Sequence, residues 1–256
     1  MATPLDDALS SLRRCVRADL RRGAWDLAER RLDAALEAPD APAAWRSLVD
    51  RLAATRIVDA RAWTQAPELA ASFRESTPWL ASMVTGIADA RLAWRTQDAE
   101  AFDRILDTAR TLAAEGDASR DLEVARAARL LQAAVAGGQY ERDEMQLLLD
   151  EADATETALR HALGDAYVPV VIARELEGDL LLQTDRYEAA VAAYEAVVRA
   201  YPSRVQPWLG LADAHERLGN VAAAARCRQV AVTMAPGFAF EPEEGLARGD
   251  DLAPRR

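Results

Sequence analysis

The C-terminal part of this 256-residue chain contains an internal repeat with a period of 34 residues. Pro202 and Pro236 are separated by that distance, and the same offset aligns small or apolar residues of the two preceding segments. The aligned pairs are Gly178 and Ala212, Tyr187 and Val221, Ala190 and Ala224, and Val197 and Ala231. Apolar residues recur at helical spacing within each copy, and a proline, which cannot continue a helix, ends it. Repeats with two helices each bury their apolar faces by stacking, so the fold is restricted to a helical array.

Helical periodicity also dominates the rest of the chain. Only 12 Gly and 11 Pro are present, and no run of alternating apolar and polar residues indicates a β-strand. Apolar stripes, capping residues and helix-ending Gly and Pro predict helices instead. They are expected at 5–20, 26–38, 45–63, 68–75, 78–95, 98–116, 119–137 and 141–163. The sequence therefore predicts an all-α protein.

The basic residues argue against several kinds of catalytic site. All 31 of them are arginine, so the chain has no lysine for a phosphate-binding loop or a Schiff base. With only two histidines, His161 and His215, a multi-histidine metal centre is disfavoured. The short motifs of nucleotide-binding proteins and hydrolases are also missing. We therefore expect no enzyme, with no catalytic residues, no cofactor and no metal site.

The net charge of −11 limits the class of partner. Binding of nucleic acid depends on positive charge, so we expect no nucleic-acid partner. No stretch has the length and apolarity of a membrane-spanning helix, so we expect no membrane partner. The N-terminal residues lack the basic and apolar regions of a secretory signal, and two cysteines make no disulfide framework. These features predict a cytoplasmic protein.

The recurring residues of the repeat resemble those of the tetratricopeptide repeat (TPR) family. That family has a 34-residue period and the pattern W-x2-L-G-x2-Y, A-x3-F, P. The first copy matches with Gly178-x2-Leu181, Tyr187-x2-Ala190-x3-Tyr194 and Pro202, and the second with Trp208-x2-Leu211-Ala212-x2-His215, Ala224 and Pro236. Arg174 replaces the tryptophan in the first copy, and Arg228 replaces the aromatic residue in the second. The resemblance implies a right-handed superhelix of antiparallel helical hairpins, with the second copy as an end repeat.

The resemblance also suggests a division of the chain into three parts. Residues 166–238 would form two tandem TPR repeats, and residues 1–165 a helical region with degenerate hairpins of the same type. Two upstream segments, Trp25-x2-Ala28-x3-Leu32 and Ala99-x2-Phe102-x3-Leu106, have the spacing of a second repeat helix, although any amphipathic helix shows it. A separate helical domain joined to two repeats is the alternative. Residues 239–256 lack helical periodicity and are expected to be a flexible acidic tail.

In the TPR family the first helix of each hairpin lines a concave groove that binds a peptide or a partner helix. The resemblance assigns to this groove Glu175, Asp179, Leu182, Gln183, Gln206, Leu209, Asp213, Glu216 and Arg217. This face is acidic with apolar islands, which fits a basic or amphipathic segment, although solvated acids without a partner are the alternative. A subset of the family grips a terminal carboxylate with Lys, Asn and Arg. The corresponding places here hold Glu175, Asp179, Gln206 and Gly210, which disfavours an acidic C-terminal peptide.

Three classes of function remain open at this point. The first is a non-enzymatic scaffold that binds a protein or peptide partner in the acidic groove. The second is a regulatory or sensor protein whose N-terminal helices bind a small ligand, with the repeats as output. The third is an enzyme with a carboxylate-based site in the N-terminal half. The repeats favour the scaffold, and self-association is compatible with all three.

Overall fold

The computed structural model describes residues 43–163, 167 and 169–234, together with the single positions 15, 30, 31 and 34. Every regular element in these ranges is a helix, which confirms the predicted all-α class. Apart from the four single positions, the helices predicted at 5–20 and 26–38 lie outside the described residues. The tail predicted at 239–256 lies outside them as well.

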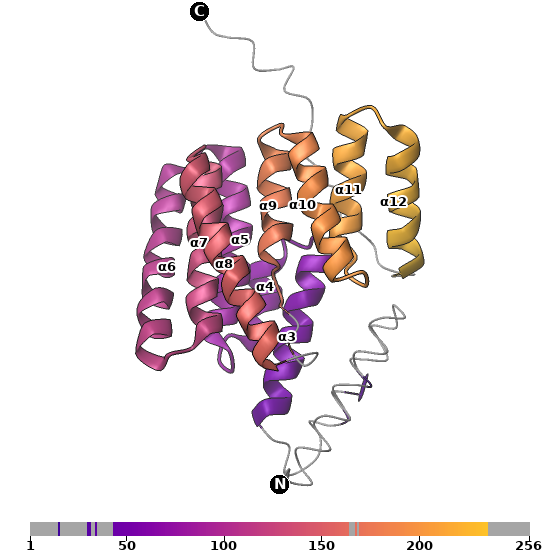
Figure 1. The fold of residues 1–256 in the computed structure, drawn as a ribbon. Helices are drawn as coiled ribbons and strands as arrows, with labels where there is room; N and C mark the ends of the chain where they lie inside the picture. Colours follow the sequence, from indigo (N-terminus) through magenta and orange to yellow (C-terminus); the bar gives the residue numbers. More distant parts are fainter. Residues whose placement is uncertain are drawn as a thin grey trace, which may run out of the picture.

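In the described part of the chain, four helical hairpins follow one another and stand in a row (Figure 1). They are α5 (Pro78–Thr96) with α6 (Ala99–Ser119), α7 (Leu122–Gly138) with α8 (Arg142–Leu163), α9 (Ala173–Gln183) with α10 (Tyr187–Ala200), and α11 (Gln206–Arg217) with α12 (Val221–Met234). Helix α7 packs on α5 and α6, α8 packs on α9, and α10 packs on α11. The predicted stack of helical hairpins is thereby confirmed.

A shorter segment precedes the hairpins and packs across them. It consists of α3 (Ala43–Asp59), α4 (Ala66–Leu69) and the 3₁₀ helix η1 (Ala70–Phe73). We call residues 43–77 the crossing segment. Its side chains Ile57, Val58 and Phe73 are buried in the same core as Leu131 of α7 and Leu180 of α9. The crossing segment and helices α5 to α9 therefore share one continuous core.

The same backbone conformation closes all four hairpins. The residue that links the two helices has a positive φ in each of them: 55° at Gln97, 63° at Tyr140, 59° at Asp185 and 76° at Gly219. This left-handed conformation satisfies the carbonyl groups at a helix end and reverses the chain within a few residues. Asp185 and Gly219 are equivalent positions of the 34-residue repeat. The two upstream hairpins have the same turn conformation at Gln97 and Tyr140, but their turn residues lie more than 34 residues apart along the chain.

One glycine has a different role from the predicted one. Gly116, which the sequence predicts as the end of a helix, lies inside α6, and that helix continues to Ser119. A Cβ atom at position 116 would lie 2.7 Å from the backbone nitrogen of Ala125 in α7. The glycine therefore permits the close approach of two helices. Helix α7 is capped by Asp121, which accepts a hydrogen bond from the Glu123 N–H at 2.9 Å.

Candidate partner-binding face

The structure divides the nine predicted groove residues into two groups. Glu175, Asp179, Leu182 and Gln206 are buried, with 1–5% of their surface exposed. Gln183, Leu209, Asp213 and Arg217 are partly exposed, and Glu216 is exposed. The prediction of an open acidic groove along α9 is thereby corrected. The physical reason is that arginines and a carboxylate from distant parts of the same chain cover this face.

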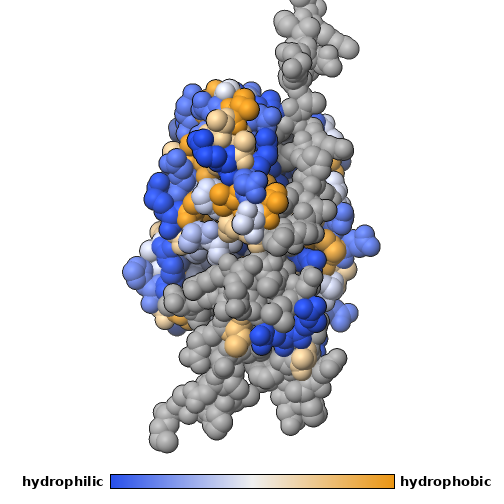
Figure 2. Space-filling view, turned by 90° about the vertical axis from the view of Figure 1, so that its right-hand side faces the viewer, coloured by the Kyte–Doolittle hydropathy of each residue, from blue (hydrophilic) through white to orange (hydrophobic). Residues whose placement is uncertain are grey.

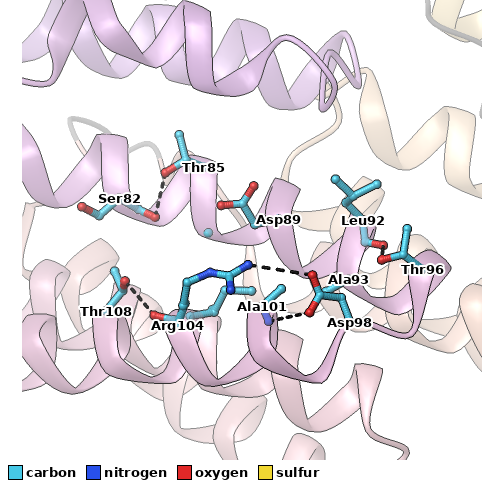
Figure 3. Close-up of a pocket in the computed structure, with 12 residues that line it drawn as sticks. Ser82, Thr85, Asp89, Leu92, Ala93, Thr96, Asp98, Ala101, Arg104 and Thr108 are labelled. Atoms are coloured by element: carbon cyan, nitrogen blue, oxygen red, sulfur yellow. Dashed lines mark hydrogen bonds and ion pairs between the residues drawn. The ribbon is translucent and has the colours of Figure 1, made fainter.

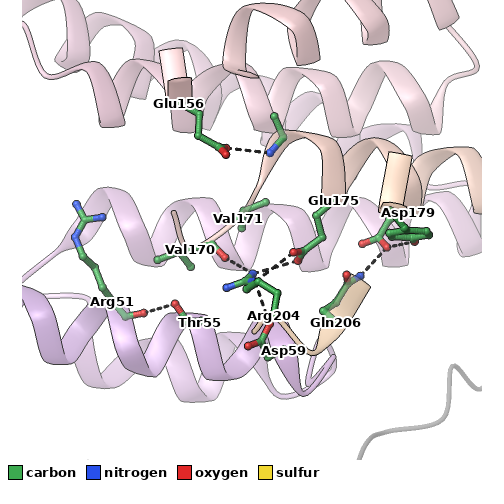
Figure 4. A network of polar contacts seen from close by, with 12 residues as sticks. Arg51, Thr55, Asp59, Glu156, Val170, Val171, Glu175, Asp179, Arg204 and Gln206 are labelled. Carbon is green, nitrogen blue, oxygen red and sulfur yellow. Dashed lines mark hydrogen bonds and ion pairs between the residues drawn. The ribbon is translucent and has the colours of Figure 1, made fainter. Parts of the chain in front are cut away.

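Arg204 is the centre of the first buried cluster (Figure 4). It precedes α11, and its guanidinium lies between carboxylates from two other elements. Its Nη2 is 3.2 Å from Glu175 Oε1 of α9, and its Nε is 3.2 Å from Asp59 Oδ1 at the end of α3. Nη2 also donates to the Val170 carbonyl at 2.7 Å. The backbone N–H of Gln206 donates to Asp59, so a residue of the crossing segment caps the first turn of α11.

Asp179 is held by three donors from three other elements. Its Oδ1 accepts from the Tyr194 hydroxyl at 2.5 Å and from Gln206 Nε2 at 2.8 Å. Its Oδ2 accepts from Arg91 Nη1 of α5 at 3.0 Å. The Arg91 guanidinium also lies over the ring of Trp63, 5.1 Å from the ring centre. A helix outside the two repeats thus supplies the cation that neutralises this predicted groove residue.

The two clusters contain more acidic than basic groups. Three buried carboxylates, Asp59, Glu175 and Asp179, share the two guanidiniums of Arg204 and Arg91. Burial raises the pKa of Glu175 to about 7, because the favourable charge of Arg204 is opposed by the nearby Asp59 and Asp179. Burial also raises the pKa of Asp59 above its ordinary value, against the effect of Arg204. Uptake of one proton by this group of carboxylates would balance the charges, and burial favours the protonated form of both Glu175 and Asp59.

Tyr194 fills the space between the two repeats and depends on two glycines. Its side chain is fully buried, and its ring lies against Gly178 of α9 and Gly210 of α11. A Cβ atom at position 178 would lie 2.6 Å from the Tyr194 ring, and one at position 210 would come closer still. Both glycines therefore leave space for the ring, and the Tyr194 hydroxyl donates to Asp179.

We expect Gly210→Ala to lower the free energy of unfolding by about 1–3 kcal/mol, because the new methyl group overpacks against the Tyr194 ring. Urea unfolding of both proteins measures the difference. The control is the same substitution in a Tyr194→Leu background, where the smaller side chain relieves the clash and the cost should fall. An equal cost in both backgrounds would contradict this account of the glycine.

Asp213 of α11 lies at the boundary between the covered and the open part of the face. Its Oδ2 accepts from Arg61 Nη1 of the crossing segment at 2.6 Å, across a sequence separation of 152 residues. On the open side, Arg228 of α12 lies 3.7 Å from Asp213 Oδ1 and pairs with Glu216. Asp213 keeps 23% of its side-chain surface exposed, whereas Arg61 keeps only 5%. Arginines from two other elements therefore already bind to this part of the predicted groove.

The open strip consists of the predicted residues that keep solvent access. They are Gln183, Leu209, Asp213, Glu216 and Arg217. The adjoining end of the molecule, seen from the α12 side in Figure 2, shows apolar and hydrophilic side chains next to one another. Val221 and Val232 of α12 are 72% and 52% exposed. The open strip and this end of the array are thus mixed in character, which suits an amphipathic partner.

A further buried ion pair was not accessible from the sequence. Arg126 of α7, 1% exposed, donates to Glu156 Oε2 of α8 at 3.3 Å and to the Val171 carbonyl at 2.8 Å. Glu156 also accepts from the Tyr201 hydroxyl at 2.7 Å. This pair fixes the connection between α8 and α9. A charged residue in the apolar run around position 126 was the available signal, but the partner could not be read from spacing.

Within the described part of the chain, no group of three or more His, Cys, Asp and Glu side chains is arranged to hold a metal ion. None of the helices described is both long and apolar enough to cross a membrane.

Comparison with known proteins identifies the C-terminal hairpins. Residues 175–237 match the model of the tetratricopeptide repeat family, which covers α9 to α12. No curated protein and no solved structure matches the chain. The resemblance noted in the sequence thus agrees with an independent comparison over the same two repeats.

Proposed function

We propose that this chain, a tetratricopeptide repeat protein in its C-terminal part, is a non-enzymatic scaffold of the cytoplasm that binds a protein partner. TPR proteins in general serve protein interactions. The finer part of the proposal is the site and the partner. A basic or amphipathic segment binds to the open strip of α9 and α11. The buried residues of the same face, Glu175, Asp179, Leu182 and Gln206, hold these helices in place.

The contact between Arg61 and Asp213 carries this proposal. It joins an acidic residue of the repeat face to an arginine 152 residues away in the sequence, at 2.6 Å. A charge-assisted bond of this kind is about twice as strong as one between neutral groups. The same carboxylate lies 3.7 Å from Arg228, and Glu216 beside it pairs with Arg228 as well. The face therefore has the chemistry to accept guanidinium groups from another segment.

Glu216 and Leu209 are accessible to solvent, so a partner would contact these two side chains. Glu216 keeps 58% of its side-chain surface exposed, so an incoming cation reaches it without rearrangement of the core. Leu209 lies on the same helix, two turns earlier, and is partly exposed. Spacing of about 10 Å between an apolar and an acidic contact suits a partner helix or an extended peptide that carries Leu-like and Arg-like side chains.

A selection from a library of short random peptides tests the proposal. We expect the wild-type chain to enrich peptides that combine arginine or lysine with apolar residues. In fluorescence anisotropy, an enriched peptide should bind the Leu209→Ala/Glu216→Arg variant at least about tenfold more weakly, because it loses an apolar contact and meets a repelling charge. Asp179 is unsuitable for charge reversal, since it is buried against Arg91 and its replacement would test folding.

The control is Glu188→Arg, which makes an identical charge reversal at an exposed position of α10. It should leave the affinity unchanged within about twofold, apart from the long-range effect of net charge. Equal weakening by both variants, with both still helical by circular dichroism, would contradict the assignment to the open strip. Enrichment of acidic peptides would contradict the proposed class of partner.

A further inference from the structure

The two ends of the row of hairpins differ in polarity. In the cleft between α5 and α6, the side chains of Thr85, Asp89 and Arg104 lie between the two helices (Figure 3). Such polar groups can stay in contact with water. At the other end, α12 exposes Val221 and Val232, by 72% and 52% of their surface. Because a terminal repeat needs a polar outer face, α12 is the end that requires a covering element.

An apolar pair lies at this end of the array, on the neighbouring helices α11 and α12. It consists of Leu209, which is partly exposed, and Val232. A contact of 3.7 Å between Asp213 Oδ1 and Arg228 Nη2 shows where the two helices face each other. Leu209 lies one turn before Asp213, and Val232 lies one turn after the arginine. Since the two helices are antiparallel, the two apolar side chains lie at the same level.

Helix α12 ends beside this pair. Its last residue, Met234, packs against the small cluster of Val205 and Ala231, and so does Leu209. The chain continues from there with residues 235–256, which lie outside the described range. The C-terminal segment therefore starts next to the apolar pair.

The preceding repeat shows what covers this face of a second helix. Three side chains of α10 pack against the apolar cluster that α10 shares with Leu211 and Ala214 of α11. They are Tyr187, Val191 and Val198. The residues 34 positions later on α12 are Val221, Ala225 and Val232, all of them exposed. On α10 the next helix covers this face, and on α12 the described residues leave it open.

The connection that follows the second helix also has a precedent. After α10, Arg204 returns to Glu175 of α9, at 3.2 Å. The residues 34 positions later are Phe238 and Leu209. An ion pair between the two repeats is thus replaced by two apolar residues at the end of the array. The repeat therefore places Phe238 where it can cover Leu209.

We propose that the C-terminal segment folds back onto this end of the array, where its two aromatic residues cover the apolar pair. Phe238 packs on Leu209, and the second aromatic residue, Phe240, lies beside it toward α12. The span is sufficient, because four residues after Met234 reach up to about 13 Å. In an extended segment, residues two apart point to the same side, so both aromatic rings can face the array. The flexible tail expected from the sequence would then begin after residue 244.

Charge and shape favour this segment over a second copy of the chain. Residues 241–244 include three glutamates, whereas α12 has two arginines and no acidic residue, so the charges are complementary. A stable contact between two copies buries about 800 Å² on each. Val221, Ala225 and Val232 form a stripe only one residue wide along α12, which matches an extended segment better.

The inference goes beyond the proposed function, although the two concern adjoining residues. Leu209 also belongs to the open strip, so a partner would have to displace the ring of Phe238 from it. The docking itself requires no partner, so measurements on the chain alone test it separately from peptide binding. Failure of one proposal therefore leaves the other standing.

Backbone ¹⁵N relaxation of the full-length chain measures the order of the segment directly. We expect order parameters above about 0.7 for residues 238–240 and below about 0.6 for residues 250–256. Values below about 0.6 for both ranges would overturn the proposal. Order that is lost when a dimer dissociates on dilution would place the segment on a second copy and overturn it as well.

Leu209→Ser removes the apolar contact without changing the segment itself. It should lower the order parameters of residues 238–240 to those of residues 250–256, and Phe238→Ser should do the same, because the apolar burial is lost. The matched control is Leu252→Ser, the same substitution near the end of the chain, which should leave residues 238–240 unchanged. Equal effects of Leu209→Ser and Leu252→Ser, or no effect of Leu209→Ser with the fold intact by circular dichroism, would contradict the assignment to Leu209.

Discussion

Replacement of Arg204 by methionine is expected to lower the free energy of unfolding by about 3–5 kcal/mol. Arg204 is 5% exposed and is the cation nearest to both Glu175 and Asp59. Its loss leaves two buried carboxylates without a counter-charge and removes the donor to the Val170 carbonyl. Urea unfolding followed by circular dichroism measures the change. The effect should be larger than that of the glycine substitution at position 210.

Two further variants show that the cost arises from uncompensated charge. Arg199→Met removes an arginine that is 69% exposed and pairs with Glu195 at 3.5 Å, so it should change stability by less than about 1 kcal/mol. The triple variant Asp59→Asn/Glu175→Gln/Arg204→Met should recover much of the lost stability, because it leaves no buried charge in the cluster. A triple variant as unstable as Arg204→Met would show that packing, and not charge, sets the cost.

The second large effect is a dependence of stability on pH that the buried carboxyl of Glu175 produces. Its pKa is raised to about 7 in the folded state, from an ordinary value of 4.5. Between these two values the folded chain holds a proton that the unfolded chain releases. The contribution of Glu175 to the free energy of unfolding therefore falls as the pH rises through this window, by about 3 kcal/mol in total, and is constant above it. Asp59, whose pKa is also raised, acts in the same direction.

Glu175→Gln isolates this contribution, because glutamine keeps the shape and cannot ionise. The variant should gain stability relative to the wild type as the pH rises from 5 to 8, and the difference between the two proteins should level off above about pH 7. Urea unfolding of both proteins at several pH values across this range gives the difference directly. A difference that stays constant with pH would mean that Glu175 is ionised throughout, which contradicts the charge balance of the cluster.

The fold was largely predictable because it rests on local signals. The 34-residue offset between Pro202 and Pro236, the small residue at Gly178 and the helix-capping positions all act within one hairpin or between neighbours. The upstream hairpins follow the same design, but their spacing is longer, and their left-handed turn residues are Gln97 and Tyr140 rather than glycine. No turn signature of the usual kind marks these two positions in the sequence.

The candidate site was predictable only in part, because its covering contacts are remote in the sequence. Arg61 pairs with Asp213 across 152 residues, and Arg91 pairs with Asp179 across 88. The position of a residue in a repeat helix predicts which face of the helix the residue occupies. It does not predict which other part of the chain packs against that face. Several of the predicted acidic residues pair with arginines of the same chain. Among the predicted groove residues, those of the open strip keep solvent access, and the proposed partner binding is therefore placed there.

The contacts of the crossing segment also change how the array is expected to unfold. In a simple solenoid each repeat contacts only its neighbours, so the ends unfold independently. Here Asp59 and Arg61 tie the last hairpin to helices that come before the first one. Their contacts, together with the shared core, favour unfolding as one cooperative unit.

Hydrogen–deuterium exchange measured by mass spectrometry tests the closed acidic face most directly. The account predicts that the amides of residues 57–64 exchange as slowly as those of α7 in the core, and that Arg61→Ala accelerates exchange in both 57–64 and α11. Rapid exchange of 57–64 in the wild-type chain, at the rate of an exposed turn, would show that this face is open in solution. That result would contradict the burial of Glu175, Asp179, Leu182 and Gln206. The whole predicted groove would then be accessible to a partner.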